Sequence, residues 1–564
     1  MDYKQKIADQ IAAAADNQIS AEEVKGKIEV PKSLDLGDYA FPAFVLAKTM
    51  HKAPQKIAAE LAEKLPQEGY EKIQAVGPYL NFFLDKKAYS KDVLSTVLEQ
   101  GKDYGSQNLG DNGTVVIDMS SPNIAKPMSM GHLRSTVIGN SLAELLKKTN
   151  YKPEKINHLG DWGTQFGKLI VAYKKWGNKE DVEKDPINTL LKYYVRFHKE
   201  DKVDPELDDE ARATFKKLQD GEEEELELWK WFRSSSLKYF MKIYKELGID
   251  FDSYKGESFY NDKMQEIVDL LKEKNLMHES RGAQIVDLDK YNLNPAMILR
   301  SDGGTLYLTR DLAAALYRYR TYNFKQALYV VGSEQANHFE QLKAVLKEMG
   351  YDWSDDIHYI PFGLITSGGK KLSTRAGRVI LLEDVLHDAV DLAHKQIDAK
   401  NPNLPNKDQV AHDVGVGAVV FHDLKNDRTN SFDFNLEEVV RFEGETGPYV
   451  QYSHARAMSI LRKAGNPDID PEKAYEISDP NAWEALRLLG DFPAEVKRAM
   501  EEYEPSVIAK YAIHLSKAFN KYYAHSKILV DDDEKDARLA LVKSVALVLK
   551  EALRLLGVQA PNEM

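Results

Sequence analysis

A strand, a helix and a second strand follow one another between residues 115 and 160, and this pattern restricts the possible folds more than any other part of the sequence. Val115–Asp118 is a short apolar run typical of a buried strand, and Lys155–Gly160 is a second strand candidate. Between them, apolar residues recur at every third or fourth position, as in an amphipathic helix. Two strands joined by one helix form a βαβ unit and lie parallel in one sheet. The sequence therefore predicts an α/β domain with a parallel sheet.

Other segments extend this domain. Strand candidates lie at residues 326–332 and 357–365, and residues 297–309 are predicted to form a hairpin that turns at Gly303-Gly304. The sequence between Trp176 and about Leu247 is charged and has helical spacing, which indicates a solvated helical insertion into the sheet domain.

The two ends of the chain have their own patterns. The first stretch mixes helix and strand signals: Pro54–Leu65 has the spacing of an amphipathic helix, and Gly77–Asp85 is typical of a strand with exposed aromatic side chains. From about Leu436 the periodicity is helical throughout, and Gly557 is placed to cap the last helix. Gly105–Gly113 is rich in Gly, Asn and Asp, which is typical of a boundary. The predicted division is an N-terminal α+β domain (1–108), an α/β domain (113–385) with its insertion (about 176–247), a connecting segment (386–435) and a C-terminal all-α domain (436–564).

Composition excludes several classes of protein. The 564 residues include no cysteine, which removes disulfides, thiolate nucleophiles and cysteine zinc sites and fits a reducing compartment, the cytoplasm by default. No apolar run is long enough for a membrane span, and the first residues lack the apolar region of a signal peptide. The net charge of −13 argues against a general nucleic-acid coat, so any nucleic-acid contact requires a local basic track.

The segment Ser121–Asn140, which leads into the first helix of the α/β domain, contains the first candidate site. Ligands of doubly wound sheets sit beyond the carboxyl ends of the strands, where a helix N-terminus offers N–H groups and a positive dipole end to phosphate. Gly131 has no Cβ and allows a flat ring to approach the backbone, His132 is placed to donate to phosphate oxygens, and Lys126 adds a positive charge. A lone histidine near a helix start is more often a capping or surface residue, so this alternative stays open for the segment by itself.

A second candidate site is the glycine-flanked loop Ser367–Arg378. Such a loop could close over a triphosphate, with its cations facing the charge that develops during reaction; a basic surface loop is the alternative. Its polar side chains are Lys370, Lys371, Ser373, Thr374, Arg375 and Arg378.

Taken in order, six segments resemble the signatures of the arginyl-tRNA synthetases, a family of class I aminoacyl-tRNA synthetases. The resemblance covers nearly the whole chain. It implies a Rossmann-type catalytic domain, an N-terminal added domain that contacts tRNA and a C-terminal helical domain that binds the anticodon. It also implies arginine, ATP with Mg²⁺ and a cognate tRNA as substrates, no zinc, and a monomer. The segments are 121–136, 157–167, 306–311, 331–339, 370–377 and 445–456.

The resemblance implies roles for individual residues. The catalytic groups would be Lys126, His132, Lys371 and Arg375, and ATP would bind at Ser129, Gly131, His132, Lys370, Lys371 and Ser373. Arginine would bind at Asp118, Asn123, His158, Tyr307, Asp311 and Gln335, with His338 lining the pocket. The tRNA would contact Tyr79, Asn81 and Phe83 near the N-terminus, and Tyr449 and Tyr452 at the anticodon, with Gln451, Tyr522 and Tyr523 as further candidates.

Two residues depart from the family's pattern and keep other classes open. In segment 121–136, Ser129 stands where the family has its first histidine. In segment 370–377, Thr374 stands where the family has its second lysine. Lys126 would supply the missing charge. These changes would suit a synthetase-like protein without activity, but His132 and Lys371 are retained. A nucleotidylyltransferase would share the Gly-His signal but would need neither the C-terminal domain nor a carboxylate pocket. Without the family, Asp311 is equally well explained as a charge near a helix N-terminus.

Overall fold

Four parallel strands form the centre of the α/β domain, in the order β10-β9-β4-β5. The predicted strands at 115–118 and 326–332 are confirmed, whereas the one predicted at 155–160 ends earlier, at Ile156. The strands are β4 (Thr114–Asp118), β5 (Lys152–Ile156), β9 (Gln326–Gly332) and β10 (Ile357–Phe362). The structure is a computed structural model and describes residues 3–31, 33–301, 304, 306–368, 370–371, 374–375 and 378–564.

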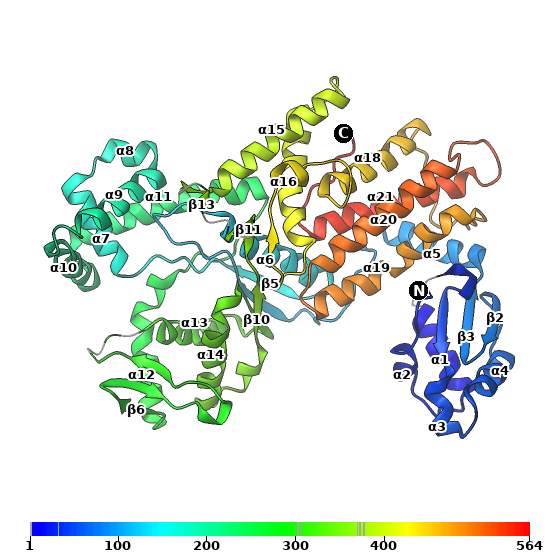
Figure 1. The fold of residues 1–564 in the computed structure, drawn as a ribbon, viewed down its shortest axis with the longest axis horizontal. Coiled ribbons are helices and arrows are strands. Elements are labelled where there is room, and N and C mark those ends of the chain that lie inside the picture. The colour runs from blue at the N-terminus through cyan, green and yellow to red at the C-terminus, as the bar shows by residue number, and fades with distance from the viewer. Residues whose placement is uncertain are drawn as a thin grey trace.

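Three helices connect the strands of this sheet or flank them along the chain. α6 (Met130–Lys148) connects β4 to β5 and completes the predicted βαβ unit. Its apolar face, including Leu133 and Val137, is buried. α13 (Tyr307–Tyr322) precedes β9, and α14 (Ala336–Glu348) follows it. In Figure 1 these two helices lie together below the sheet.

The hairpin predicted at residues 297–309 is wrong in its second arm. β8 (Ala296–Leu299) pairs with β7 (Ala283–Val286), which pairs with β6 (Met277–Ser280). Tyr307–Thr309 instead form the first turn of α13, because Leu308, Leu312 and Leu316 share a face that is buried in the core. Gly303, at the predicted turn, lies outside the described residues.

The stretch predicted as a charged helical insertion is helical, and it forms a lobe at the left of Figure 1. Its last helix, α11, returns to the sheet domain, where the Tyr244 hydroxyl lies 2.7 Å from the Ser120 hydroxyl. The helices of the lobe are α7 (Thr164–Trp176), α8 (Lys179–Lys184), α9 (Pro186–Glu200), α10 (Glu206–Asp220) and α11 (Glu223–Leu247).

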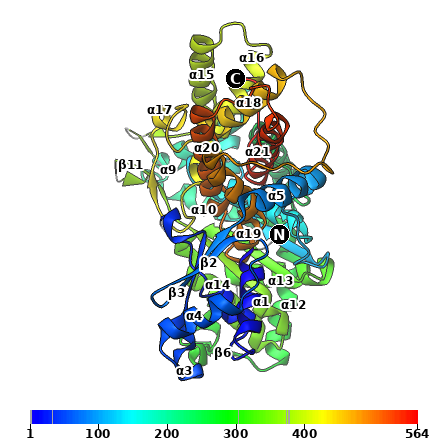
Figure 2. The same cartoon turned by 90° about the vertical axis from the view of Figure 1, so that its right-hand side faces the viewer.

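The N-terminal residues form a small antiparallel sheet in the order β1-β3-β2, packed with helices (Figures 1 and 2). This unit is bonded to the C-terminal helices: the Trp483 indole donates to Asp38 at 2.8 Å, and the Tyr104 hydroxyl donates to the Leu489 carbonyl at 2.8 Å. Its main elements are α1 (Tyr3–Ala14), β1 (Tyr39–Pro42), α4 (Pro54–Lys64), β2 (Tyr70–Val76), β3 (Tyr79–Leu84) and α5 (Lys86–Gln100).

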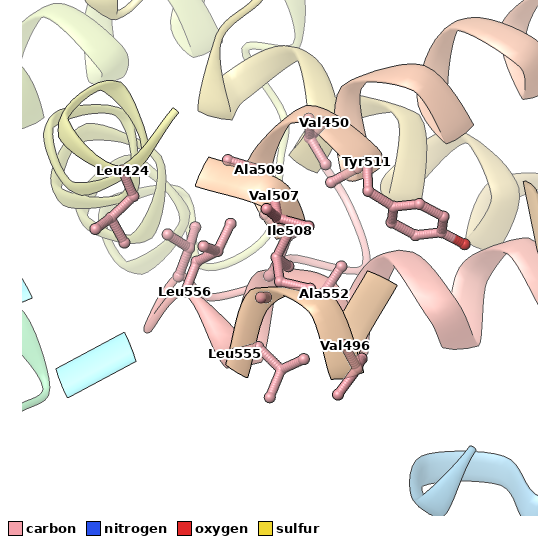
Figure 3. Close-up of a cluster of buried hydrophobic side chains, with 14 of the residues drawn as sticks. Leu424, Val450, Val496, Val507, Ile508, Ala509, Tyr511, Ala552, Leu555 and Leu556 are labelled. Atoms are coloured by element: carbon pink, nitrogen blue, oxygen red, sulfur yellow. The ribbon is translucent and has the colours of Figure 1, made fainter. Parts of the chain in front are cut away.

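From Leu436 the chain is mainly helical, as predicted, and two long helices of the predicted connecting segment share the same apolar core. Figure 3 shows side chains such as Val450, Ile508 and Ala552 meeting from different helices. Gly557 has φ +73° and its N–H donates to the Arg554 carbonyl, so it ends the last helix as expected. The helices are α15 (Leu382–Lys400), α16 (Lys407–Leu424), α17 (Leu436–Val439), α18 (Gly447–Lys463), α19 (Trp483–Glu501), α20 (Ser506–His525) and α21 (Lys535–Leu555). None of the described helices has the length and apolarity needed to cross a membrane.

Candidate active site

The strand order places a ligand crevice at the carboxyl ends of β4 and β9. From β4 the chain passes through α6 to β5 on one side, and β9 lies on the other side, so β4 is the point where the topology changes direction. In doubly wound sheets, ligands bind at such a point, beyond the carboxyl ends of the strands. The segments that follow β4, β5 and β9 all contain predicted site residues, and the structure brings them to this edge of the sheet.

His132 lies in the first turn of α6, in a defined hydrogen-bonding state. The Ser129 N–H donates to Nδ1 of His132 at 3.0 Å, so Nδ1 is an acceptor and the proton of the neutral ring is on Nε2. Burial lowers the pKa of the His132 imidazole, and Lys126 lowers it further, against the bond from Ser129. The ring is therefore a neutral Nε2–H donor at pH 7. Gly131 beside it is exposed, and a Cβ added there would meet only the Ser129 hydroxyl, at 3.6 Å.

The backbone of the second cationic segment starts from a strand pair and returns beside the start of α6. β12 (Lys370–Lys371) pairs antiparallel with β11 (Ile365–Ser367). After the loop, Leu381 forms a β-bridge with Ser129, and the Leu382 N–H donates to the Met128 carbonyl at 2.9 Å. The loop therefore returns directly beside the Gly131-His132 turn. Ser373 and the side chains of Lys370, Lys371 and Arg375 lie outside the described part of the chain.

Lys126 precedes α6 and is held by the helical lobe. Its ammonium lies 5.5 Å from the ring centroid of Tyr194 on α9, in a cation–π arrangement. The lobe therefore helps to position Lys126, which was predicted from the sequence to bind phosphate.

An acidic pocket forms where α13 and α14 begin. Asp311, in the second turn of α13, lies 2.6 Å from Nε2 of His338 on α14 and 4.0 Å from Nε2 of His158, which follows β5. Burial alone would raise the pKa of the Asp311 carboxyl, but the bond from His338 and the nearby cations bring it below its ordinary value. Asp311 is therefore ionised and available to a cation. Tyr307, one turn earlier on the same helix, is 64% exposed.

Asp118 belongs to this region but already has a cationic partner. Arg318 of α13 places Nη1 2.8 Å from Asp118, and both side chains are almost fully buried. The other carboxylate oxygen accepts from the Ser121 hydroxyl at 3.0 Å, and Nη2 of Arg318 lies 3.2 Å from Nδ1 of His158. Asp118 is therefore part of the pocket wall, and its contacts do not favour the expected direct role in binding arginine.

Asn123 and Gln335 lie in the segments that follow β4 and β9, and both are exposed. Asn123 forms a parallel β-bridge with Gly160, where a Cβ would come within 2.0 Å of the Asn123 amide oxygen. Gly160 therefore allows the segment after β5 to pack against the segment before α6. Gln335 ends the short 3₁₀ helix that follows β9.

Sequence motifs did not indicate Arg318, Arg310 or Glu257 as site residues. Arg310 lies 3.9 Å from Glu257, and burial raises the pKa of the Glu257 carboxyl to about 7, with Arg310 opposing this shift and Asp311 adding to it. The one available signal was the spacing of Asp311 and Arg318, which are seven residues apart and so share a helix face. Within the described residues, no cluster of three or more His, Cys, Asp or Glu could hold a metal ion.

The candidate tRNA-binding residues differ in accessibility. Tyr79 and Phe83 are partly exposed on β3, whereas Asn81 is 3% exposed and cannot present its side chain to a ligand in this structure. On α18, Tyr449 and Tyr452 are partly exposed. Gln451 and Tyr522 are buried in the core, so neither side chain is accessible to tRNA in this structure.

A small cationic cavity lies at the outer side of the C-terminal helices. The Arg456 guanidinium lies 4.9 Å from the ring centroid of Tyr452 and 5.1 Å from that of Tyr523. The cavity has a volume of about 330 Å³, and its lining includes Tyr452, Arg456, Arg462, Lys463 and Tyr523.

The chain is similar to known proteins over its whole length. Three family models match it: "Arginyl tRNA synthetase N terminal domain" at residues 1–84, "tRNA synthetases class I (R), catalytic domain" at 93–436 and "DALR anticodon binding domain" at 450–564. It is 73% identical to the arginine–tRNA ligase of Ligilactobacillus salivarius and 69% identical to that of Lactiplantibacillus plantarum, over 100% of each chain. Among solved structures, Thermus thermophilus arginyl-tRNA synthetase matches with a TM-score of 0.83 and 26% identity, over 100% of both chains.

Proposed function

The chain belongs to the arginyl-tRNA synthetase family, and we propose that its active site lies between the first turn of α6 and the Asp311 pocket of α13. The enzyme activates arginine with ATP, releases pyrophosphate and transfers the arginyl group to the 3′ end of its tRNA. The observation that supports this site best is the convergence of two unlike groups at one sheet edge: a neutral imidazole donor at a helix N-terminus and an ionised, partly buried carboxylate.

We propose that Asp311 binds the guanidinium of the substrate. A guanidinium has a fixed fork of donors and a permanent charge, and a carboxylate is its best-matched acceptor. Tyr307 would add a hydroxyl from the preceding turn, while His158 and His338 hold the carboxylate in place. Asn123 and Gln335 would bind the α-amino and α-carboxyl end. Lysine, ornithine and citrulline would each leave buried acceptors unmatched.

The ATP phosphates would bind between α6 and the Lys370–Arg375 loop. The substrate carboxylate attacks the α-phosphorus, a new O–P bond forms, and the bond to pyrophosphate breaks; no enzyme nucleophile is required. His132, Lys126, Lys371 and Arg375 would stabilise the charge on the phosphates, and Mg²⁺ would enter with them. Gly131 would leave room for the adenine ring, and Ser129, Lys370 and Ser373 would complete the ATP site.

We propose that the other parts of the chain bind tRNA. Residues 1–108 would contact the tRNA through Tyr79 and Phe83, residues 113–385 would hold the catalytic site, and residues 386–435 would connect it to the anticodon-binding domain at 436–564. One chain contains every group assigned here, so a monomer would suffice. An enzyme that uses ATP and tRNA would act in the cytoplasm.

Arginine-dependent exchange of labelled pyrophosphate into ATP tests the function. We expect exchange with arginine alone among the amino acids, and the assay is to be run with and without tRNA. A nucleotidylyltransferase would show no requirement for arginine, and an inactive synthetase-like protein would show no exchange under either condition.

Replacement of Arg456 by Ala is expected to raise the KM for tRNA about tenfold, because stacking and cation–π contacts contribute about 1–3 kcal/mol per base. The KM values for arginine and ATP should stay unchanged. Arg320→Ala is the control. Arg320 is an exposed arginine of α13 that pairs with Glu266, away from the C-terminal helices that carry Arg456. An unaltered KM for tRNA in Arg456→Ala would remove the Tyr452–Arg456–Tyr523 cavity from the binding surface.

Wild-type tRNA binding should weaken steeply with added salt, since phosphate contacts release counterions.

A further inference from the structure

Arg134 is a buried cation that the proposed reaction does not use directly. It lies two residues after His132 on α6, and its side chain is 1% exposed. Its Nε lies 3.3 Å from Oδ1 of Asp423, at the end of α16, and that carboxylate is also 1% exposed. Its Nη1 donates to the Asn430 carbonyl at 2.9 Å. One guanidinium thus binds α6 to two places in the segment that follows the sheet domain.

Asn430 belongs to residues 427–434, which we call the crossing segment. This segment contains β15 (Phe432–Asp433), which pairs in parallel with β11: Ile365 is opposite Phe432, and Thr366 is opposite Asp433. The Arg134 guanidinium also lies 4.9 Å from the ring centroid of Phe432. Since β11 continues into β12, the crossing segment supports the strand pair from which the Lys370–Arg375 loop extends.

The crossing segment packs closely against the residues between β10 and β11. A Cβ added to Gly363, between β10 and β11, would lie 2.6 Å from the Asn430 carbonyl. The Gly363 N–H donates to the Arg428 carbonyl at 2.9 Å, and the Leu364 N–H donates to the Ser431 hydroxyl at 2.9 Å. These contacts leave little freedom between β11 and the crossing segment, so the bonds from Arg134 also fix the position of β11 relative to α6.

We propose that Arg134 is a positioning residue that sets the placement of the strand pair β11–β12, from which the Lys370–Arg375 loop extends, relative to His132. This inference rests on the proposed role of both segments in binding the ATP phosphates. The two bonds of Arg134 come from one rigid, planar fork, so they fix orientation as well as distance, which a lysine ammonium cannot do. Catalysis by positioning requires this precision, because the reacting phosphate must meet the neutral His132 donor and the cations of the loop at once.

Stability alone does not explain the pair. Burying two charges costs several kcal/mol in desolvation, and apolar side chains at such positions are often as stable or more stable. Here Nη2 of Arg134 and Oδ2 of Asp423 also lack a hydrogen-bond partner among the described residues. An unsatisfied buried charge is a further cost. A role in fixing the geometry of the site accounts for a pair that is expensive to bury.

The same helix offers a matched control. Lys148, at the opposite end of α6, lies 3.0 Å from Glu551 of α21, and the two side chains are 4% and 8% exposed. This pair is also buried and also ties α6 to a C-terminal helix, but it makes no contact with the crossing segment. Lys148→Met therefore removes a buried ion pair from the same helix, and Glu551 keeps Arg554 as a partner at 2.8 Å.

Arg134→Lys is tested by arginine-dependent pyrophosphate exchange. We expect kcat to fall about 100-fold, because a displacement of about 1 Å at a reacting group has an effect of this size, with the KM for arginine unchanged. ATP should also lose its ability to slow tryptic cleavage after Lys370, Lys371 and Arg375. Lys148→Met should lower the melting temperature while keeping both kcat and the protection by ATP.

Two outcomes would overturn the proposal: Arg134→Lys with wild-type kcat, or with a loss that Lys148→Met shares. If Arg134→Lys does not fold, Asp423→Asn replaces it, since this variant retains the Oδ1 acceptor and the bond to Asn430. It should lower kcat by a smaller factor, and an unchanged kcat would again contradict the proposal. Lys371→Ala tests the proposed function of the loop independently of Arg134. If that variant keeps full activity, the loop itself has no role in binding the ATP phosphates.

Discussion

Replacement of Asp311 by Ala is expected to raise the KM for arginine by at least about 30-fold, because truncating one partner of a buried, hydrogen-bonded charge pair costs about 2–5 kcal/mol. The substrate guanidinium would enter a pocket in which no remaining carboxylate is free, since Asp118 is already bonded to Arg318 and Ser121. The KM for ATP should stay close to its wild-type value. Steady-state kinetics of pyrophosphate exchange, with arginine and ATP varied separately, measures both constants.

Asp311→Asn separates charge from shape. It keeps an acceptor oxygen of the same size but loses the ionic component, which makes a hydrogen bond to a charged partner about twice as strong as a neutral one. Its KM should lie between those of the wild type and Asp311→Ala. The control is Asp269→Ala on α12 (Met264–Glu273), an exposed carboxylate that accepts from Gln265 at 2.9 Å. An arginine KM that is the same in Asp311→Ala and in the control would remove Asp311 from the binding site.

The parts of the fold that were predictable are those with a short-range pattern. β4, β9 and α6 follow from runs and repeats of apolar side chains that do not depend on distant contacts. The location of His132 was predictable for a related reason: in a parallel sheet, the segment after a strand always opens at the carboxyl edge. The sequence of a βαβ unit therefore predicts where a site lies before any distance is known.

The parts that were not predictable depend on partners far along the chain. The Gly303-Gly304 pair favours a turn, but the burial of Leu308, Leu312 and Leu316 makes the following residues helical. The alternation in β3 predicts accessible odd-numbered side chains, yet Asn81 is covered by the packing of its own domain. Tertiary packing overrides local preference in both cases.

Arg318 shows the same limit at the site itself. In the sequence it is one of two arginines in Tyr317–Tyr322, and only its spacing from Asp311 distinguishes it from a surface cation. Only the pairing of β4 beside β9, with α13 packed against them, brings it to Asp118. An arginine that is built into the pocket wall neutralises one of the two carboxylates there, so Asp311 is left as the carboxylate that can pair with a substrate cation.

Arg318→Met is expected to destabilise the protein by about 3–5 kcal/mol, because removing one partner of a buried ion pair leaves the other charge uncompensated. Burial would by itself lower the pKa of the Arg318 guanidinium, but Asp118 and Tyr260 hold it above its ordinary value, so the arginine is charged and its loss is felt at every accessible pH. Urea unfolding, followed by tryptophan fluorescence, measures the change. Asp118→Asn/Arg318→Met should be more stable than Arg318→Met, since the double variant has no unpaired charge to bury.

The double variant also decides what Asp118 does. If Asp118 serves only to hold Arg318, then adding Asp118→Asn to Arg318→Met should leave the KM for arginine unchanged while it restores stability. If Asp118 binds the substrate directly, Arg318→Met would release it for that purpose, and its removal in the double variant would raise the KM again. The first result is expected, because in the intact protein both carboxylate oxygens of Asp118 are already occupied by Arg318 and Ser121. The specificity of the pocket would then depend on the difference between the two carboxylates: Asp118 is neutralised within the fold, and Asp311 is neutralised by the substrate.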